Sequence, residues 1–275
     1  MDRHLIVLDL DGTLLTDNKT ISKRSLHALR EARKAGHAVA IATGRPFRAS
    51  QMYYQELALD TPIVNFNGAF VHHPADYSFK GRHSPLDLNV AQTIIDTCQA
   101  FNVQNIMAEV VDDVYVHDYD EQFVDLFSMG TSPAAYGNLK HILDKDPTSL
   151  LVYPKEKEDA EHLQSLLGNK HAKGVHQRSW GAPFHMLEII KTGNNKAAGL
   201  ELVTEYCNVS MENVIAFGDE DNDLEMIEEA GIGVAMGNAI SDLKNIANEV
   251  TLTNEEDGIA LFLEDRLSLP SPSKR

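Results

Sequence analysis

A short apolar run leads directly into an acidic loop near the start of the chain. Leu5-Ile6-Val7-Leu8 is followed by Asp9-Leu10-Asp11-Gly12. A continuous apolar run of this length is typical of a strand that is buried on both faces of a parallel sheet. The sequence therefore predicts a buried strand over residues 5–8, with Asp9 at its carboxyl end.

The segment after this strand alternates between helix and strand signals. Residues 22–35 have helical spacing, with Ser22 as the N-cap and Gly36 as the stop, and a second apolar run covers residues 39–42. Strand, helix and strand within about 40 residues form a βαβ unit. Further strands are expected over 63–66, 214–217, 233–236 and 250–252, and further helices over 196–206, 223–229 and 258–264. This order predicts an α/β fold with a Rossmann-like, doubly wound parallel sheet.

The middle of the chain has a different pattern. A helical signal near residues 86–101 is followed by alternating stretches that are typical of half-buried strands. We therefore expect an α+β insert in a discontinuous core. The predicted division is a core of residues 1–83 and 191–269, an inserted domain of residues 84–190, and a disordered tail of residues 270–275.

The composition narrows the possible partners. The formal net charge of −17 opposes binding to nucleic acid, whose phosphates are usually neutralised by clustered Lys and Arg. The first apolar run is too short for a signal peptide or a membrane span, so we expect a cytoplasmic protein that does not bind membranes. An acidic protein that binds phosphate esters needs a local positive site made of a metal ion, a few cations and backbone N–H groups.

Two acidic loops follow predicted strands. Asp9 and Asp11 lie two residues apart, so a divalent cation could hold one carboxylate as ligand and nucleophile, while the other, with a raised pKa, serves as general acid and base. The alternative is an ordinary Asp-Gly turn. The second loop, Gly218-Asp219-Glu220-Asp221-Asn222-Asp223, suits a hard cation, and the alternative here is a solvated helix N-terminus.

Two further segments offer positive groups. Thr43-Gly44-Arg45 supplies a hydroxyl, a flexible backbone N–H and a cation at the end of a strand, which could cradle a phosphate. Lys196 lies in the first turn of a predicted helix, where the macrodipole disfavours a cation unless an anion is nearby. A phosphoryl group or Asp9 would be such a partner.

Taken in order, these four segments resemble the four motifs of haloacid dehalogenase-type phosphatases. Asn67-Gly68-Ala69 and the position of the insert are similar to the Cof-like branch, whose large cap lies between the second and third motifs. The resemblance covers nearly the whole chain and implies a Rossmann-like core with an inserted cap domain.

The resemblance also implies roles for individual residues. Asp9 would attack phosphorus, Asp11 would protonate the leaving alcohol and then activate water, and Thr43 and Lys196 would hold the phosphoryl oxygens. The implied Mg²⁺ site consists of Asp9, the carbonyl of Asp11, and Asp219, with Asp223 and Asn222 around it. The implied substrate-side residues are Gly44, Arg45, Asn67 and Asn222.

The implied function is hydrolysis of small phosphate monoesters, such as sugar phosphates or phosphorylated cofactors and their precursors. A phosphomutase would use the same aspartyl-phosphate but return the group to its substrate. A phospho-ligand-binding regulatory protein would carry an Asp at a strand end without turnover. Asp11 argues against the regulatory protein, because such a protein needs no second acid/base.

Overall fold

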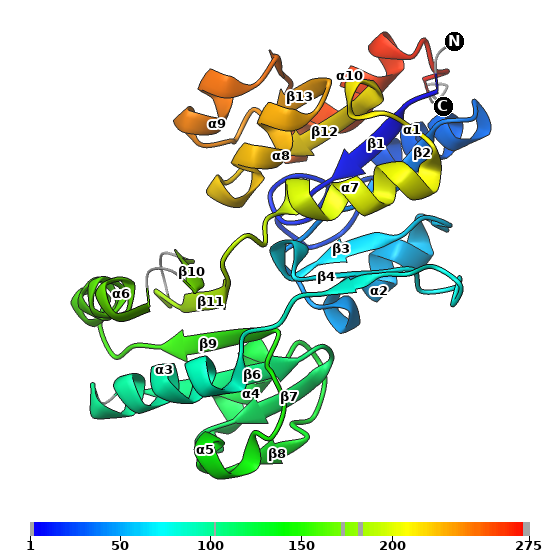
Figure 1. The fold of residues 1–275 in the computed structure, drawn as a ribbon. Coiled ribbons are helices and arrows are strands. Elements are labelled where there is room, and N and C mark those ends of the chain that lie inside the picture. The colour runs from blue at the N-terminus through cyan, green and yellow to red at the C-terminus, as the bar shows by residue number, and fades with distance from the viewer. Residues whose placement is uncertain (1–2, 102, 172–173, 181–183, 272–275) are drawn as a thin grey trace. The chain divides into compact units, whose positions relative to one another are not determined.

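The computed structural model describes residues 3–101, 103–171, 174–180 and 184–271. Contacts divide the chain into two compact units (Figure 1). Unit 1 comprises Met1–Arg45, Ser50–Arg82 and Asn195–Arg275, and unit 2 comprises Pro46–Ala49 and His83–Asn194. That the units fold as separate domains stays a prediction. Of the predicted tail, residues 272–275 lie outside the described residues, and the Ser271 hydroxyl donates to Glu264 over 2.7 Å.

Unit 1 is built on a parallel sheet with the strand order β14-β13-β12-β1-β2. Its strands are β1 (Leu5–Leu8), β2 (Ala38–Ile41), β12 (Val214–Gly218), β13 (Ile232–Ala235) and β14 (Glu249–Val250). The chain moves outward from β1 in one direction through β2 and, after the insert, in the other direction through β12. The boundary between β1 and β12 is therefore the topological switch point, where open α/β sheets bind ligands. The predicted α/β fold with a parallel core sheet is confirmed.

A smaller sheet continues unit 1 beyond β2. Its strands are β3 (Ile63–Asn65), β4 (Phe70–His72) and β5 (Arg82–His83), in that order. A parallel bridge between Ala42 and Val64 links it to the end of β2. The loops after β2 and β3 are consequently held next to each other.

Helices connect the strands of unit 1. They are α1 (Lys23–Lys34), α2 (Phe47–Glu56), α7 (Lys196–Cys207), α8 (Leu224–Glu229), α9 (Ser241–Ile246) and α10 (Gly258–Arg266). The predicted start of α1 is confirmed, since the Ser22 hydroxyl accepts a hydrogen bond from the Ser25 N–H. The sequence did not predict α2. Its buried face includes Ser50, Tyr53 and Tyr54, whose polar atoms hide the apolar period.

Unit 2 contains a six-stranded sheet with the order β10-β11-β9-β6-β7-β8. The strands are β6 (Asn105–Val110), β7 (Asp113–Val116), β8 (Ala135–Tyr136), β9 (Ser149–Tyr153), β10 (Val175–Ser179) and β11 (Leu187–Lys191). The helices are α3 (Leu88–Ala100), α4 (Glu121–Phe127), α5 (Leu139–Ile142) and α6 (Lys157–His171). Every neighbouring strand pair is antiparallel except β7 and β8.

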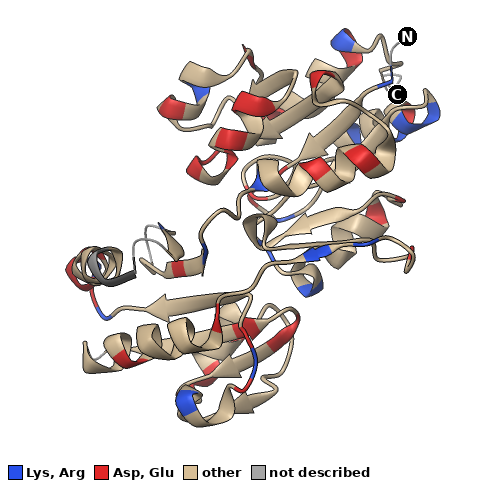
Figure 2. Cartoon of the chain, in the orientation of Figure 1, with Lys and Arg blue, Asp and Glu red and all other residues tan. Residues whose placement is uncertain are grey.

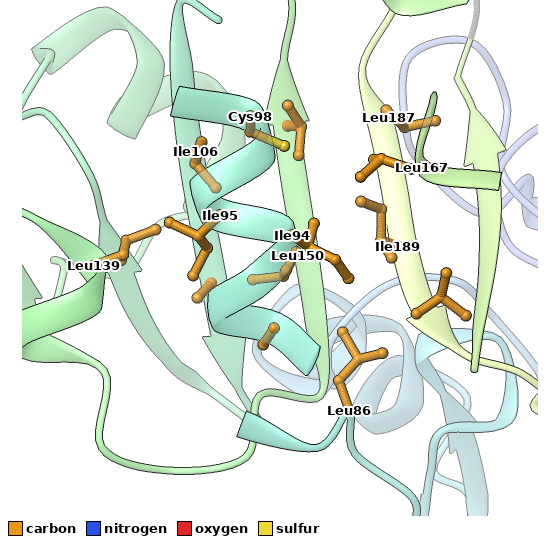
Figure 3. Close-up of a cluster of buried hydrophobic side chains, with 14 of the residues drawn as sticks. Leu86, Ile94, Ile95, Cys98, Ile106, Leu139, Leu150, Leu167, Leu187 and Ile189 are labelled. Carbon is orange, nitrogen blue, oxygen red and sulfur yellow. The ribbon is translucent and has the colours of Figure 1, made fainter. Parts of the chain in front are cut away.

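Alternation along the strands gives this sheet two apolar faces. Ile106 and Leu150 pack with Ile94 and Ile95 of α3 in one buried cluster (Figure 3). Met107, the next residue along β6, belongs to a separate cluster with residues of α4. Side chains of successive strand residues point to opposite faces, so the pattern follows directly from the strand geometry.

Acidic positions outnumber basic ones along the ribbon, in keeping with the net charge of −17 (Figure 2). Among the described residues, no helix combines the length and the apolar character needed to span a bilayer.

Candidate active site

The switch point brings two acidic loops together. Leu8 pairs with Phe217, and the Asp9 N–H donates to the Phe217 carbonyl over 3.2 Å. Asp9 therefore lies beside the loop that carries Asp219. Both side chains are largely buried, with residue exposures of 6% for Asp9 and 8% for Asp219.

Lys196 provides a positive charge within this acidic cluster. It is the first residue of α7, and its Nζ lies 2.6 Å from Asp9 Oδ1 and 2.6 Å from Asp223 Oδ1. The lysine is fully buried. Burial lowers the pKa of the ammonium, but the two carboxylates outweigh this effect and raise it above its ordinary value. The anionic partner expected for Lys196 is thus Asp9, together with Asp223.

Asp223 has both oxygens engaged. Oδ1 accepts from Lys196, and Oδ2 accepts from the backbone N–H groups of Asp219 (3.0 Å) and Glu220 (3.1 Å). This carboxylate shapes the loop and holds the lysine. Of the carboxylates predicted around a metal, those of Asp9 and Asp219 remain better placed to accept a cation directly.

Asp219 is oriented by the loop after β1. Its Oδ1 accepts from the Thr13 hydroxyl over 2.8 Å. Gly12 has a φ of +74°, and a Cβ at this position would lie 2.1 Å from Asp219 Oδ2. Only glycine both fits this space and adopts this backbone conformation readily.

The cluster has the donor set of a hard-cation site. Asp9, Asp219 and Asp223 each offer a carboxylate oxygen, and these oxygens lie within 4.8 Å of one another. Carboxylate oxygens are the ligands that Mg²⁺ and Ca²⁺ prefer. The residues present therefore fit a divalent cation.

The pKa values of this cluster reflect its excess negative charge. Burial raises the pKa of Asp9 to about 7, with Lys196 opposing the effect and Asp223 adding to it. Burial also raises the pKa of Asp219 to about 8, and the neighbouring Asp9 and Asp223 contribute. Both carboxyls compete for the ammonium of Lys196, so a proton or a metal ion at this point relieves repulsion.

The prediction of a raised pKa for Asp11 is wrong. A raised pKa was expected for this carboxyl, but the structure lowers it to about 2. Burial alone would raise the value, and it is outweighed by Arg45, which donates from Nε (2.6 Å) and Nη2 (2.6 Å), and by Lys19 Nζ at 2.7 Å. The Asp11 carboxylate is therefore held by two cations in this state.

The remaining predicted residues line the adjacent loops. The Thr43 hydroxyl accepts from the Arg45 N–H over 3.1 Å. Asn222 Nδ2 donates to Asn67 Oδ1 over 2.9 Å, and a Cβ on Gly44 would lie 3.2 Å from the Asn67 amide. These contacts join the loops after β2, β3 and β12. All ten predicted residues thus lie in unit 1, at loops around the switch point and at the start of α7.

Three residues that contact this site were not predicted from the sequence. Thr13 directly follows the loop Asp9-Leu10-Asp11-Gly12, and its hydroxyl could have been assigned to the neighbouring carboxylates. Lys19 reaches Asp11 from a loop residue with a φ of 56°. Asn238 lies in the loop after β13 and donates to the Gly12 carbonyl over 2.8 Å. No spacing in the sequence predicts that Lys19 contacts Asp11 or that Asn238 contacts Gly12.

Comparison with known proteins supports one family. A family model described as haloacid dehalogenase-like hydrolase matches residues 6–263. The chain is 53% identical over 266 residues to the 5-amino-6-(5-phospho-D-ribitylamino)uracil phosphatase YitU of Bacillus subtilis, with 97% of this chain and 98% of that protein covered.

Two more similarities extend over whole chains. The pyridoxal phosphate phosphatase YbhA of Escherichia coli is 34% identical over 279 residues, covering 97% of this chain and all of YbhA. The crystal structure of TM0651 from Thermotoga maritima superimposes with a TM-score of 0.83 at 28% identity, covering 98% of this chain and 99% of that one.

Proposed function

Because the chain belongs to the haloacid dehalogenase-like hydrolases and is a phosphatase, we propose that it hydrolyses small phosphate monoesters with Asp9 as nucleophile and Mg²⁺ as cofactor. The observation that carries the proposal is the contact between Lys196 and Asp9, 2.6 Å apart beside Asp219 and Asp223. This contact supports the proposal, because it brings the proposed nucleophile and a cation together with carboxylates that could bind a metal.

The metal would be held by Asp9, Asp219 and the Asp11 carbonyl, and it would neutralise charge on the phosphoryl oxygens. Asp223 would act through its neighbours, because its oxygens already bind Lys196 and the Asp219 loop. The three carboxylates bear more negative charge than Lys196 can balance, which favours a divalent cation at this point.

The proposed reaction has two steps. In the first, an Asp9 carboxylate oxygen attacks phosphorus, the bond from phosphorus to the ester oxygen breaks, and Asp11 gives its proton to the leaving alcohol. In the second, Asp11 takes a proton from water, the water oxygen attacks phosphorus, and the bond to Asp9 breaks to release inorganic phosphate. Asp11 has to leave Arg45 and Lys19 before it can carry a proton.

The other loop residues would position the phosphoryl group. Lys196 and Thr43 would contact its oxygens, since phosphoryl transfer depends mainly on positioning and charge neutralisation. Gly44, Arg45 and the linked pair of Asn67 and Asn222 would line the substrate side.

For the substrate, we propose 5-amino-6-(5-phospho-D-ribitylamino)uracil as the first candidate, because YitU is named for it and shares 53% identity over nearly its full length. Pyridoxal phosphate is the second, from the name of YbhA. Selection between such esters by the inserted residues 84–190 stays a prediction from the family resemblance.

The test is release of inorganic phosphate from these two esters and a panel of sugar phosphates, with Mg²⁺ and with EDTA. We expect metal-dependent turnover that falls by about a thousandfold or more in Asp9→Asn. Asp242→Asn makes the same change on an exposed residue of α9 and should retain full activity. Transfer of phosphate back to substrate without release would indicate a mutase, and metal binding without turnover would indicate a regulatory protein.

A further inference from the structure

Asn238 links three loops at the carboxyl end of the parallel sheet. Its Nδ2 lies 2.8 Å from the Gly12 carbonyl and 3.5 Å from Asp219 Oδ2. Its Oδ1 accepts from the Asn254 N–H over 3.1 Å. Asn238 follows β13, so one amide connects this loop to those that follow β1, β12 and β14.

The orientation of this amide is fixed by its partners. The Gly12 carbonyl can only accept, so it requires the NH₂ group, which then also faces Asp219 Oδ2. The Asn254 N–H can only donate, so it requires the amide oxygen. Asn254 is itself fixed, because its Nδ2 donates to the Leu15 carbonyl over 2.9 Å.

The Asn238 amide contacts the site where Gly12 and Asp219 are closely packed. The Gly12 backbone packs against Asp219, since a Cβ there would lie 2.1 Å from Oδ2. The Asn238 amide contacts both the Gly12 carbonyl and Asp219 Oδ2. The Thr13 hydroxyl donates to the other oxygen of Asp219 over 2.8 Å. The Asp219 carboxylate is therefore oriented from two sides by neutral donors.

We propose that Asn238 is a positioning residue for the cation site: it fixes the Asp219 carboxylate and the Gly12 turn in the arrangement that accepts Mg²⁺. This inference rests on the proposed function, because it takes Asp219 to be a metal ligand. Partners that orient a metal ligand through hydrogen bonds commonly change metal affinity by about 10–100-fold when removed.

The experiment measures the Mg²⁺ dissociation constant by calorimetry on the full chain for wild type, Asn238→Ala, Asn248→Ala and Asp219→Asn. Asn248 is the matched control, because its side chain accepts from the N–H of Gly233, near the start of β13, whereas the site lies at the carboxyl ends of the strands. We expect Asn238→Ala to weaken Mg²⁺ binding about tenfold and Asn248→Ala to leave it unchanged.

A thermal melt in EDTA separates positioning from folding. Weakened Mg²⁺ binding in Asn238→Ala, at a melting temperature no lower than that of Asn248→Ala, supports the proposal. A dissociation constant within about twofold of wild type overturns it, as does equal weakening in both variants. If Asp219→Asn binds Mg²⁺ like wild type, the proposed metal site itself is wrong, which is a distinguishable result.

Discussion

Each unit of the molecule buries a cluster of charged side chains, and the two clusters differ in how their charges balance. In unit 1, Lys196 faces the carboxylates of Asp9 and Asp223, with Asp219 beside them. Among the described residues, this cluster sets three acidic groups against one ammonium.

The cluster in unit 2 pairs one cation with one buried anion. Arg48 contacts Glu109 and is 10% exposed in its side chain, against 5% for Glu109. The guanidinium also donates to the Ser128 carbonyl over 2.9 Å, and the second oxygen of Glu109 accepts from the Ser149 hydroxyl over 2.6 Å. A buried pair with further hydrogen bonds on both members is the arrangement that tolerates burial.

The difference separates a binding site from a structural contact. A balanced, hydrogen-bonded pair needs nothing more, whereas surplus carboxylates in a buried place must take up protons or a cation. Burial of charge alone therefore does not indicate function, whereas unbalanced burial at a switch point is the arrangement that the proposed metal site requires.

The largest expected effect comes from the same substitution in both clusters. Lys196→Met and Arg48→Met each leave buried carboxylate without its partner, which should lower the free energy of unfolding by about 3–5 kcal/mol in EDTA. Mg²⁺ should restore part of this loss in Lys196→Met, because it supplies the missing positive charge. It should restore none in Arg48→Met beyond its effect on wild type.

Urea unfolding with EDTA and with Mg²⁺ measures both variants. Equal recovery of Arg48→Met would show that the contrast between the clusters is false. So would a Lys196→Met variant as stable as wild type in EDTA.

The sequence predicted the unbalanced cluster much better than the balanced one. Apolar strands that end in polar loops place Asp9 and Asp219 at one edge of a sheet, and a lysine at a helix start requires an anion. Arg48 and Glu109 are 61 residues apart and belong to no motif. Their contact depends on how the short segment Pro46–Ala49, which belongs to unit 2, packs against the β6–β7 hairpin, and no local pattern records this.

Side-chain direction was also beyond the sequence. The motif predicts that Asp11 lies near Asp9, but it does not predict that Arg45 and Lys19 bind the Asp11 carboxylate. Lys19 reaches it from a loop position with a φ of 56°. The Tyr53 hydroxyl holds this turn through the Lys19 carbonyl over 2.9 Å. Such contacts arise from tertiary packing between segments that the sequence separates.

A second prediction compares the replacement of one carboxylate by an amide in each cluster. Asp219→Asn should weaken Mg²⁺ binding by about 10–100-fold, or about 1.4–2.7 kcal/mol. It should stabilise the metal-free protein at neutral pH, because the amide is neutral without having to take up a proton on folding. Glu109→Gln should destabilise the protein by about 1.5–3 kcal/mol, because Arg48 loses a charged partner, and should leave Mg²⁺ affinity unchanged. Calorimetry measures the change in Mg²⁺ affinity, and urea unfolding in EDTA measures the change in the free energy of unfolding. A metal-free Asp219→Asn less stable than wild type would contradict the argument.

The smallest effect is a pH dependence that belongs to the unbalanced cluster. The pKa values of about 7 for Asp9 and about 8 for Asp219 lie above the ordinary 3.8, so in EDTA the folded protein keeps protons that the unfolded chain has already released. The stabilisation is therefore fully present below about pH 4 and is lost as the pH rises through 7 and 8.

Between pH 7 and 8 the free energy of unfolding in EDTA should fall by about 1 kcal/mol. Mg²⁺ replaces the protons, so the stability that it adds should grow over the same interval. Asp219→Asn should flatten the dependence because one titrating carboxyl is gone, whereas Glu109→Gln should keep the wild-type slope. Urea unfolding at pH 6, 7 and 8 decides the matter: a metal-free stability that rises with pH would mean that these carboxyls are charged in the fold and that the surplus is balanced by another group.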